Sequence, residues 1–252
     1  MSDFDRNVAA RGFGAARAAE IDAGLRAYMI RIYNYMAAGV ALTGVVSWLT
    51  FNAAVVTDAA GKITGLTSFG QTIFSGPLTI VLFLATLGIV FFLSFRIDKL
   101  QASTALMLFM GYAALLGLML SSVFLAYTGA SVTRTFFISA ASFGALSLYG
   151  YTTQRDLSPV GSFLIMGLFG LIIAMLVNLF LKSSGLDFAI SAIGVLIFAG
   201  LTAWDTQKIK EMYDVQDDGT VAGRKSVMGA LTLYLDFINL FLFMLRFLGD
   251  RR

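Results

Sequence analysis

An aspartate lies inside the last strongly apolar stretch of the sequence, which runs from about residue 228 to residue 248. An ionisable side chain in such a stretch is costly and is a functional candidate by default. In a helix, Asp236 lies on one stripe with residues at helical spacing, namely Gly229, Thr232, Asn239, Phe243 and Arg246. We expect this polar stripe to face the centre of a helix bundle or a water-filled path. The alternative is that Asp236 only links helices by hydrogen bonding.

A second aspartate, Asp205, ends the preceding apolar stretch at residues 187–205. On a helix it shares a face with Ser191, Phe198 and Thr202. The C-terminus of a helix is already partly negative, so an acid at this position favours a nearby partner. The alternative is a solvated acid at a helix end.

Asp205 and Asp236 are expected near the same membrane face. Asp205 ends its helix at that face, and the last helix begins there near residue 228 and reaches Asp236 after about 12 Å. Two carboxylates close together in a low-dielectric site cannot both ionise cheaply, so the pair would hold a proton. It would act as a pH sensor without histidine and, when deprotonated, as a candidate calcium site. Arg246 lies about 15 Å from Asp236 along the helix and needs another partner. Arg96 would be a membrane anchor, or a latch if an acid lies near it.

The composition excludes most enzyme chemistry. The 252 residues include neither Cys nor His, which removes disulfides, thiolate metal sites, Ser-His-Asp triads and imidazole switches. Hydrophobic residues make up 58% and charged residues only 13%, about half the charged share of a soluble domain. We therefore expect a membrane protein that is not an enzyme, needs no cofactor and has no nucleic-acid surface.

The few charges divide the sequence into apolar intervals long enough to cross a bilayer. The run from Leu78 to Leu84 does not alternate between apolar and polar residues, which excludes a barrel strand. The sequence predicts an all-α bundle of seven membrane helices, with room for a short re-entrant piece in each of the two longest intervals. Small residues at four-residue spacing predict an interior position for the fourth helix. The seven helices are expected at residues 28–51, 77–96, 104–127, 134–153, 160–181, 187–205 and 228–248.

The Lys and Arg residues are distributed unevenly over the connecting segments. With the N-terminus inside, about two thirds of the 18 lie on the cytoplasmic side, which favours a cytoplasmic N-terminus and an outer C-terminus. We expect a cytoplasmic tail at residues 1–27, a membrane domain at 28–249 and a short tail at 250–252. Four acids in the first 22 residues argue against a transit peptide.

Several segments resemble one family of membrane proteins. The segments are Leu233–Phe241 followed by Leu245–Gly249, Tyr149–Thr152 leading to Arg155–Leu157, Asp205–Gln207, and Gly24–Met29 with Tyr33–Met36. They resemble the Bax inhibitor-1 family, also called the transmembrane Bax-inhibitor-motif family, and its bacterial inner-membrane members in particular. The resemblance covers about residues 22–249, and its last-helix motif is long and specific.

The resemblance implies a fold in which the last helix is wrapped by the other six, and a pH-sensitive calcium leak channel. It also implies that Asp205 and Asp236 form the sensor, that Arg96 acts as the latch and that Arg246 is a family position. One feature departs from the pattern, because some bacterial members have a glutamate within the second helix and residues 77–95 contain no acid.

Other functions stay open beside a passive calcium leak. The charged tail favours regulation of a membrane-anchored ATP-dependent protease by binding, which some bacterial relatives perform. The same carboxylates would serve a proton-coupled calcium exchanger, whose flux depends on a proton gradient. An aspartate intramembrane protease is disfavoured because the motifs around presenilin-type catalytic aspartates are absent. A rhodopsin is excluded because the last helix has no lysine, the nearest being Lys225.

Overall fold

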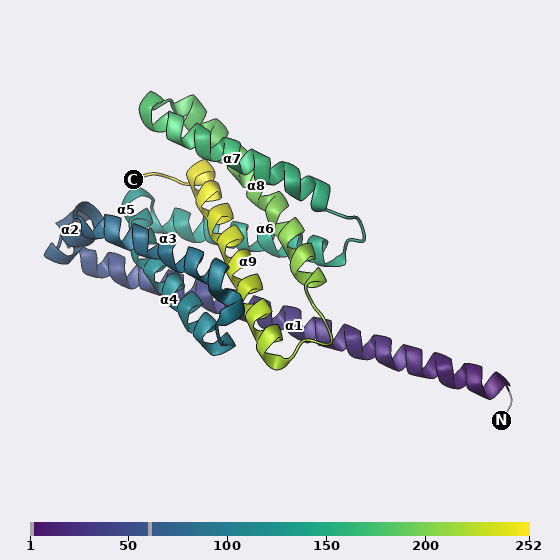
Figure 1. Cartoon of the computed structure of the whole chain (residues 1–252). Helices are drawn as coiled ribbons and strands as arrows, with labels where there is room; N and C mark the ends of the chain where they lie inside the picture. The colour runs from purple at the N-terminus through teal and green to yellow at the C-terminus, as the bar shows by residue number, and fades with distance from the viewer. Residues whose placement is uncertain (1–2, 60–61) are drawn as a thin grey trace.

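The computed structural model describes residues 3–59 and 62–252, with side chains from Asp22 onwards. The described chain is almost entirely helical (Figure 1). The expected tail at residues 1–27 therefore lies largely outside the described side chains. The long helices are α1 (Asp3–Ala54), α3 (Leu78–Arg96), α4 (Ala102–Leu120), α6 (Gly129–Thr152), α7 (Ser158–Leu181), α8 (Ser184–Glu211) and α9 (Gly219–Leu248).

Six segments of the described chain are long and apolar enough to cross a membrane. They are Asp22–Ala54, Leu78–Lys99, Ala102–Ala126, Ser158–Leu181, Ser184–Glu211 and Gly219–Leu248. The remaining expected span corresponds to α6, which is 24 residues long but carries many Ser, Thr and Gly residues. The protein is thus an α-helical membrane protein with six spans by this measure, and α6 falls short on apolarity rather than on length.

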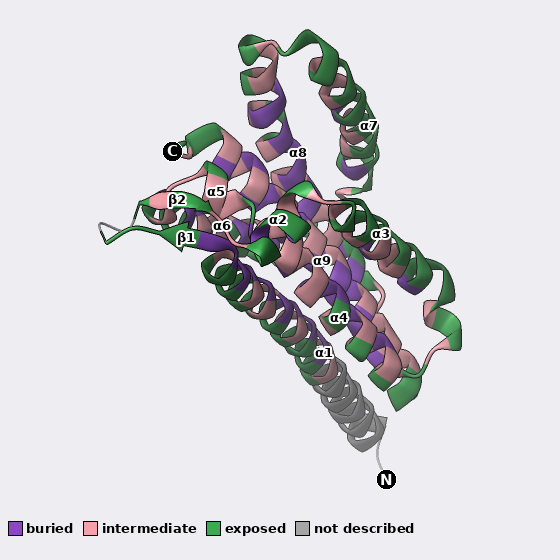
Figure 2. Cartoon of the chain, turned by 90° about the vertical axis from the view of Figure 1, so that its left-hand side faces the viewer, coloured by how far each residue is buried: buried purple, intermediate pink, exposed green. Residues whose placement is uncertain are grey.

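The core is built around α9, which packs against α1, α4, α6 and α8. Figure 2 shows buried residues gathered along α9 and exposed residues along α3 and α7. Tyr234 is fully buried, with edge-on rings of Phe109 and Tyr112 at 5.4 and 5.9 Å. Its hydroxyl is 2.6 Å from that of Thr43. Apolar side chains such as Phe180, 87% exposed, instead form the surface that suits lipid.

Short elements fill the connections. The strands β1 (Val55–Thr57) and β2 (Ile63–Leu66) form an antiparallel pair that the hydropathy pattern does not predict. The short helix α2 (Ser68–Ser75) follows, in one of the two intervals where the sequence leaves room for a short extra piece. A 3₁₀ turn, η1 (Ile97–Lys99), extends α3, and α5 (Val123–Ala126) continues α4 after a break.

The helix α6 runs the full height of the bundle beside α8. At one end, the Thr128 N–H donates to Asp250 O at 3.2 Å and ties the start of α6 to the end of the chain. At the other end, Gln207 Nε2 donates to Arg155 O at 2.8 Å, just after α6 ends. One face of α6 is buried, as expected for an interior helix. A Cβ at Gly150 would lie 2.1 Å from Ala203 O, so glycine allows this close approach to α8.

The opposite face of α6 is exposed, so the helix is only half interior. Gly144 and Leu148 lie on this exposed face. The buried face packs against α8 and α9, and the small residues on the opposite face contact no neighbouring helix of the described chain closely.

Candidate functional site

The polar stripe of α9 faces a cavity of about 780 Å³. Residues of α7, α8 and α9 line it, together with Ser94 near the end of α3. We call it the carboxylate cavity. Its charged and amide-bearing lining residues, with the Thr232 hydroxyl, are Asp205, Lys208, Thr232, Asp236, Asn239 and Arg246.

Two helices bring the aspartates together. Asp205 comes from the last third of α8 and Asp236 from the middle of α9, and their carboxyl groups lie within hydrogen-bonding range. Asp236 is only 5% exposed, and among the described residues its Oδ2 atom has no hydrogen-bond partner. A buried carboxylate oxygen without a donor is costly, so this arrangement suits a bound proton or cation.

Lys208 is the cation beside the pair. It lies close enough to Asp205 for electrostatic attraction, and its Nζ is 5.0 Å from the centre of the Trp204 ring. Sequence reasoning missed this residue, although its position three residues after Asp205 on a helix was the signal.

Arg96 does not line the carboxylate cavity. It is the last residue of α3 and is exposed, and no ion pair of Arg96 is present among the described residues. Ser94, two positions earlier, does line the cavity. Side chains two positions apart on a helix point in directions that differ by about 200°. Because Ser94 faces the cavity, Arg96 points away from the carboxylates. Its role as a latch stays a prediction.

The remaining predicted residues divide into two groups. Thr232 and Asn239 line the cavity, and each also donates to a carbonyl of its own helix, at 3.1 Å to Met228 O and 2.8 Å to Leu235 O. Thr202 is fully buried and donates to Phe198 O at 2.7 Å. It lies outside the lining, on the side of α8 that packs into the core.

Arg246 ends the stripe and has its partner on another helix, as its distance from Asp236 requires. It forms an ion pair with Asp187 in the first turn of α8. Arg251 lies 3.4 Å from the same carboxylate, and Arg134 lies 2.9 Å from Asp250 nearby. We call these five residues the terminal cluster. Arg246 also lines a second cavity of about 370 Å³, so it separates two hollows.

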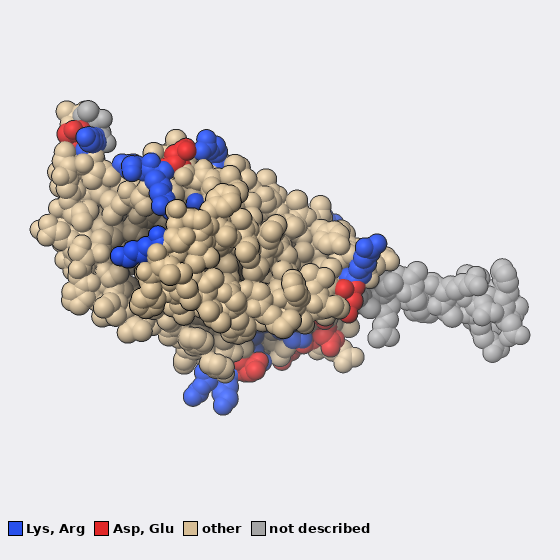
Figure 3. Space-filling view, turned by 90° about the horizontal axis from the view of Figure 1, so that it is seen from above, with Lys and Arg blue, Asp and Glu red and all other residues tan. Residues whose placement is uncertain are grey.

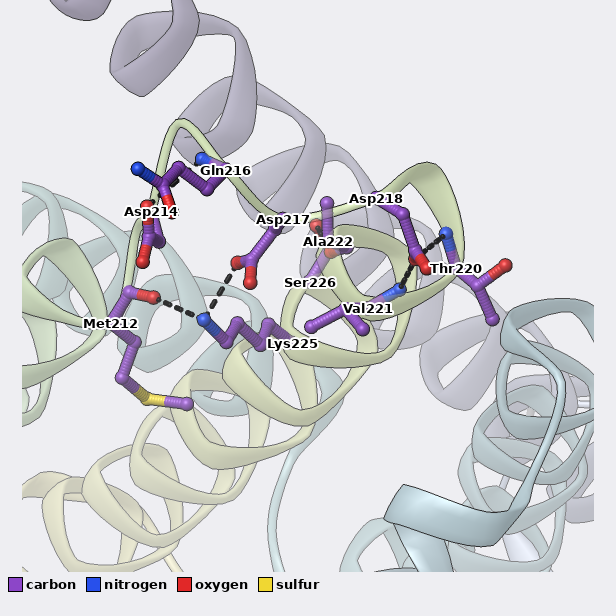
Figure 4. Close-up of polar contacts among 10 residues, drawn as sticks. All are labelled: Met212, Asp214, Gln216, Asp217, Asp218, Thr220, Val221, Ala222, Lys225 and Ser226. Carbon is purple, nitrogen blue, oxygen red and sulfur yellow. Dashed lines mark hydrogen bonds and ion pairs between the residues drawn. The ribbon is translucent and has the colours of Figure 1, made fainter.

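The opposite end of α8 and α9 is held by a second set of polar contacts. Lys225 Nζ donates to Met212 O at 3.0 Å and to Asp217 at 2.6 Å (Figure 4). Asp218 accepts from the N–H groups of Thr220 and Val221 and caps α9. These contacts fix the loop that joins the two aspartate-bearing helices and thereby constrain the distance between the carboxylates.

A chain of hydroxyl groups on the far side of α8 holds it against α1 and α6. The Tyr33 hydroxyl is 2.7 Å from Ser147 Oγ, and Ser147 Oγ is 2.9 Å from Thr206 Oγ1. Figure 3 shows a broad uncharged face, with charged side chains near its edge and in a hollow toward one end. Most buried polar side chains of the bundle bond to one another or to backbone, and among the described residues Tyr28 Oη, Thr135 Oγ1 and Asp236 Oδ2 are buried without a hydrogen-bond partner.

Carboxylate, amide and hydroxyl oxygens are the ligands that calcium prefers. In the described part of the chain no group of three or more acidic side chains that could hold a metal ion is present. Asp205, Asp236 and Asn239 place such oxygens on the carboxylate cavity, and their use as calcium ligands stays a prediction.

Comparison with known proteins identifies close relatives. A family model described as inhibitor of apoptosis-promoting Bax1 matches residues 25–252. The inner membrane protein YbhL of Escherichia coli strain K12 is 48% identical over 232 residues, which cover 91% of this chain and 94% of YbhL. The uncharacterized protein RP147 of Rickettsia prowazekii is 53% identical over 234 residues, or 92% of each chain. A protein of Caulobacter vibrioides is 43% identical over 254 residues and covers both chains completely.

Proposed function

This chain belongs to the Bax inhibitor-1 family of membrane proteins, and from that premise we propose that it is a passive calcium pathway gated by protons. We place it in the bacterial inner membrane, where its relative YbhL is named as resident. Calcium is the ion that passes, and the aspartate pair is the group that responds to pH.

The observation that carries this proposal is the shared cavity of Asp205 and Asp236. Its lining on α9 extends from Met228 to Arg246, which is about 27 Å along the helix axis. The hydrocarbon core of a bilayer is about 30 Å thick. The cavity therefore follows most of the distance that an ion has to cross, with two carboxylates on the way.

Gating would follow from the charge of the pair. When both carboxylates are deprotonated they attract a divalent cation, and when they hold a proton this attraction weakens. At the far end, the ion pair of Arg246 and Asp187 would have to open to join the two cavities. Movement of the end of α3 would be needed to bring Arg96 to the pair, since it now points away.

We further propose that α6 is the seventh span and that the N-terminus is cytoplasmic. The helix is about 36 Å long at 24 residues, and its ends lie beside opposite ends of α8. The other helices would then surround α9. Because the chain has no Cys, single cysteines can report sidedness. In intact cells an impermeant maleimide should label Arg252→Cys and leave Gln216→Cys unlabelled. The reverse pattern, with Gln216→Cys labelled and Arg252→Cys unlabelled, is the one expected for six spans with a cytoplasmic N-terminus and would overturn this topology.

Calcium flux into proteoliposomes that contain a calcium-sensitive dye tests the pathway itself. The wild-type leak should change with pH, and Asp236→Asn should remove that response, with Asp156→Asn as a matched control outside the cavity. A leak that keeps its pH response in Asp236→Asn contradicts the sensor. Flux that requires an imposed proton gradient indicates an exchanger, and absence of flux leaves binding of a protease as the function to test.

A further inference from the structure

The carboxylate cavity is large for an ion path. Its volume of about 780 Å³ lies within the range of about 300–1,000 Å³ that is typical of pockets for small organic ligands. Most of its wall is apolar, and four side chains of α7 form one side of it. These are Ile165, Leu168, Ile172 and Met175.

The charges in the cavity leave one acid, Asp236, without a cation beside it. Arg246 is bound to Asp187, and Lys208 lies beside Asp205. The Asp236 side chain is more than nine-tenths buried, and its Oδ2 atom has no hydrogen-bond partner among the described residues. The cavity therefore offers one carboxylate to a ligand that carries a single positive charge.

The cavity is also accessible from the side of the bundle. Ile165 and Ile172 line it and are nevertheless 38% and 41% exposed, so the cavity reaches the surface that faces lipid. The main packing partner of α7 is α8, and Figure 1 shows α7 at the edge of the bundle. A ligand dissolved in the bilayer has a route to the carboxylates that does not cross the aqueous ends.

We propose that the carboxylate cavity binds an amphipathic amine from the membrane, with its ammonium group against Asp236 and its hydrocarbon chain along α7. Pockets that bind small organic ligands are usually lined by apolar side chains, with a few polar or charged groups that fix the orientation of the ligand. The ring of Trp204 lies in the same wall and packs on α7, since a Cβ at Gly161 would lie 2.1 Å from it. A bound amine would fill the path, so this ligand would inhibit any ion flux.

Fluorescence of Trp204 can test binding on the full-length purified protein. The chain has only 2 Trp residues, so Trp48→Phe leaves Trp204 as the single reporter. The probe is a long-chain primary amine with a nitroxide quencher on its chain, and the control probe is the alcohol of equal length. The amine should quench Trp204 saturably, and Asp236→Asn should raise its dissociation constant by about tenfold or more.

A second pair of variants separates cavity binding from loss of folding. Ile172→Trp, read by the thermal stabilisation that the amine gives, should fill the cavity and abolish binding. Ile173→Trp, on the neighbouring position of α7 and 61% exposed, should bind like wild type. Equal quenching by amine and alcohol, or equal stabilisation of both tryptophan variants, would overturn the proposal. The assay uses no ion gradient, so its result is independent of the calcium pathway.

Discussion

Two charged regions on α9 differ in how their charges are paired. In the terminal cluster, Arg246 is bound to Asp187, and Arg251 lies 3.4 Å from the same carboxylate. In the carboxylate cavity, about 15 Å earlier along the helix, Asp236 is more deeply buried and has a carboxylate as its neighbour. Buried polar groups are normally paired, and one that is left without a hydrogen-bond partner calls for an explanation. The comparison supports the proposed sensor in the carboxylate cavity and favours a mainly stabilising role for the terminal cluster while its ion pair is closed.

The largest difference is expected between Asp187→Asn and Asp236→Asn. Loss of the Asp187 charge leaves Arg246, whose side chain is 30% exposed, without its partner. The free energy of unfolding should fall by about 1–3 kcal/mol, between the values for exposed and buried pairs. Asp236→Asn removes a buried carboxyl group that lies against the carboxyl group of Asp205 and should be neutral or stabilising. Thermal unfolding in one detergent measures both, and a larger loss for Asp236→Asn would reverse the comparison.

The wall of the cavity should tolerate less change than the lipid-facing side of the same helix. In Gly161→Ala the new Cβ would overlap the Trp204 ring, and such overpacking costs about 1–3 kcal/mol. In Gly170→Ala the Cβ meets no atom within 4 Å, and the change should stabilise α7 by about 0.5–1 kcal/mol. Thermal unfolding and the emission maximum of Trp204 report both effects. Equal behaviour of the two variants would show that Trp204 is not held by Gly161.

The Gln207 side chain joins α8 to the segment between α6 and α7 by two hydrogen bonds, close to the carboxylate cavity. It accepts from the Leu157 N–H and donates to Arg155 O, both at 2.8 Å. Gln207→Ala should lower the free energy of unfolding by about 1–2 kcal/mol, because two backbone groups lose their partner. Gln154→Ala, at an exposed position, is the matched control. A loss equal to that of the control would mean that water replaces the amide fully.

The smallest effect is expected for the outermost pair of the terminal cluster. The side chains of Arg134 and Asp250 are 59% and 68% exposed, and exposed ion pairs contribute about 0.2–1 kcal/mol. Asp250→Asn should therefore change the unfolding temperature much less than Asp187→Asn does, and the difference should shrink in high salt. A loss as large as that of Asp187→Asn would mean that the cluster acts as one network.

The sequence predicts the helices well because the bilayer demands long apolar stretches. The expected 77–96 and 160–181 agree closely with α3 and α7. The ends of α8 and α9 differ more, since α9 begins at Gly219 rather than near residue 228. Hydropathy reports where a chain is apolar, but a capping residue such as Asp218 decides where its helix begins. The strands β1 and β2, of 3 and 4 residues, are too short to produce a hydropathy signal.

The stripe on α9 and the acid that ends α8 could be read from helical periodicity alone. The partner of Arg246 could not, because Asp187 lies far away in sequence and only the packing of α8 on α9 brings them together. The direction of the Arg96 side chain also depends on helix packing and could not be predicted. Its membrane level follows from the sequence, whereas its direction depends on the rotation of α3 about its axis, which places Ser94 on the cavity instead.

The length of α8 has a consequence for how the two aspartate-bearing helices lie. At 28 residues the helix is about 42 Å long, which exceeds a hydrocarbon core of about 30 Å. Asp187 and Asp205 are about 27 Å apart along α8, whereas their partners Arg246 and Asp236 are only about 15 Å apart along α9. Because both contacts form, α8 is inclined to α9, and a change in this inclination would change the distance between the two carboxylates.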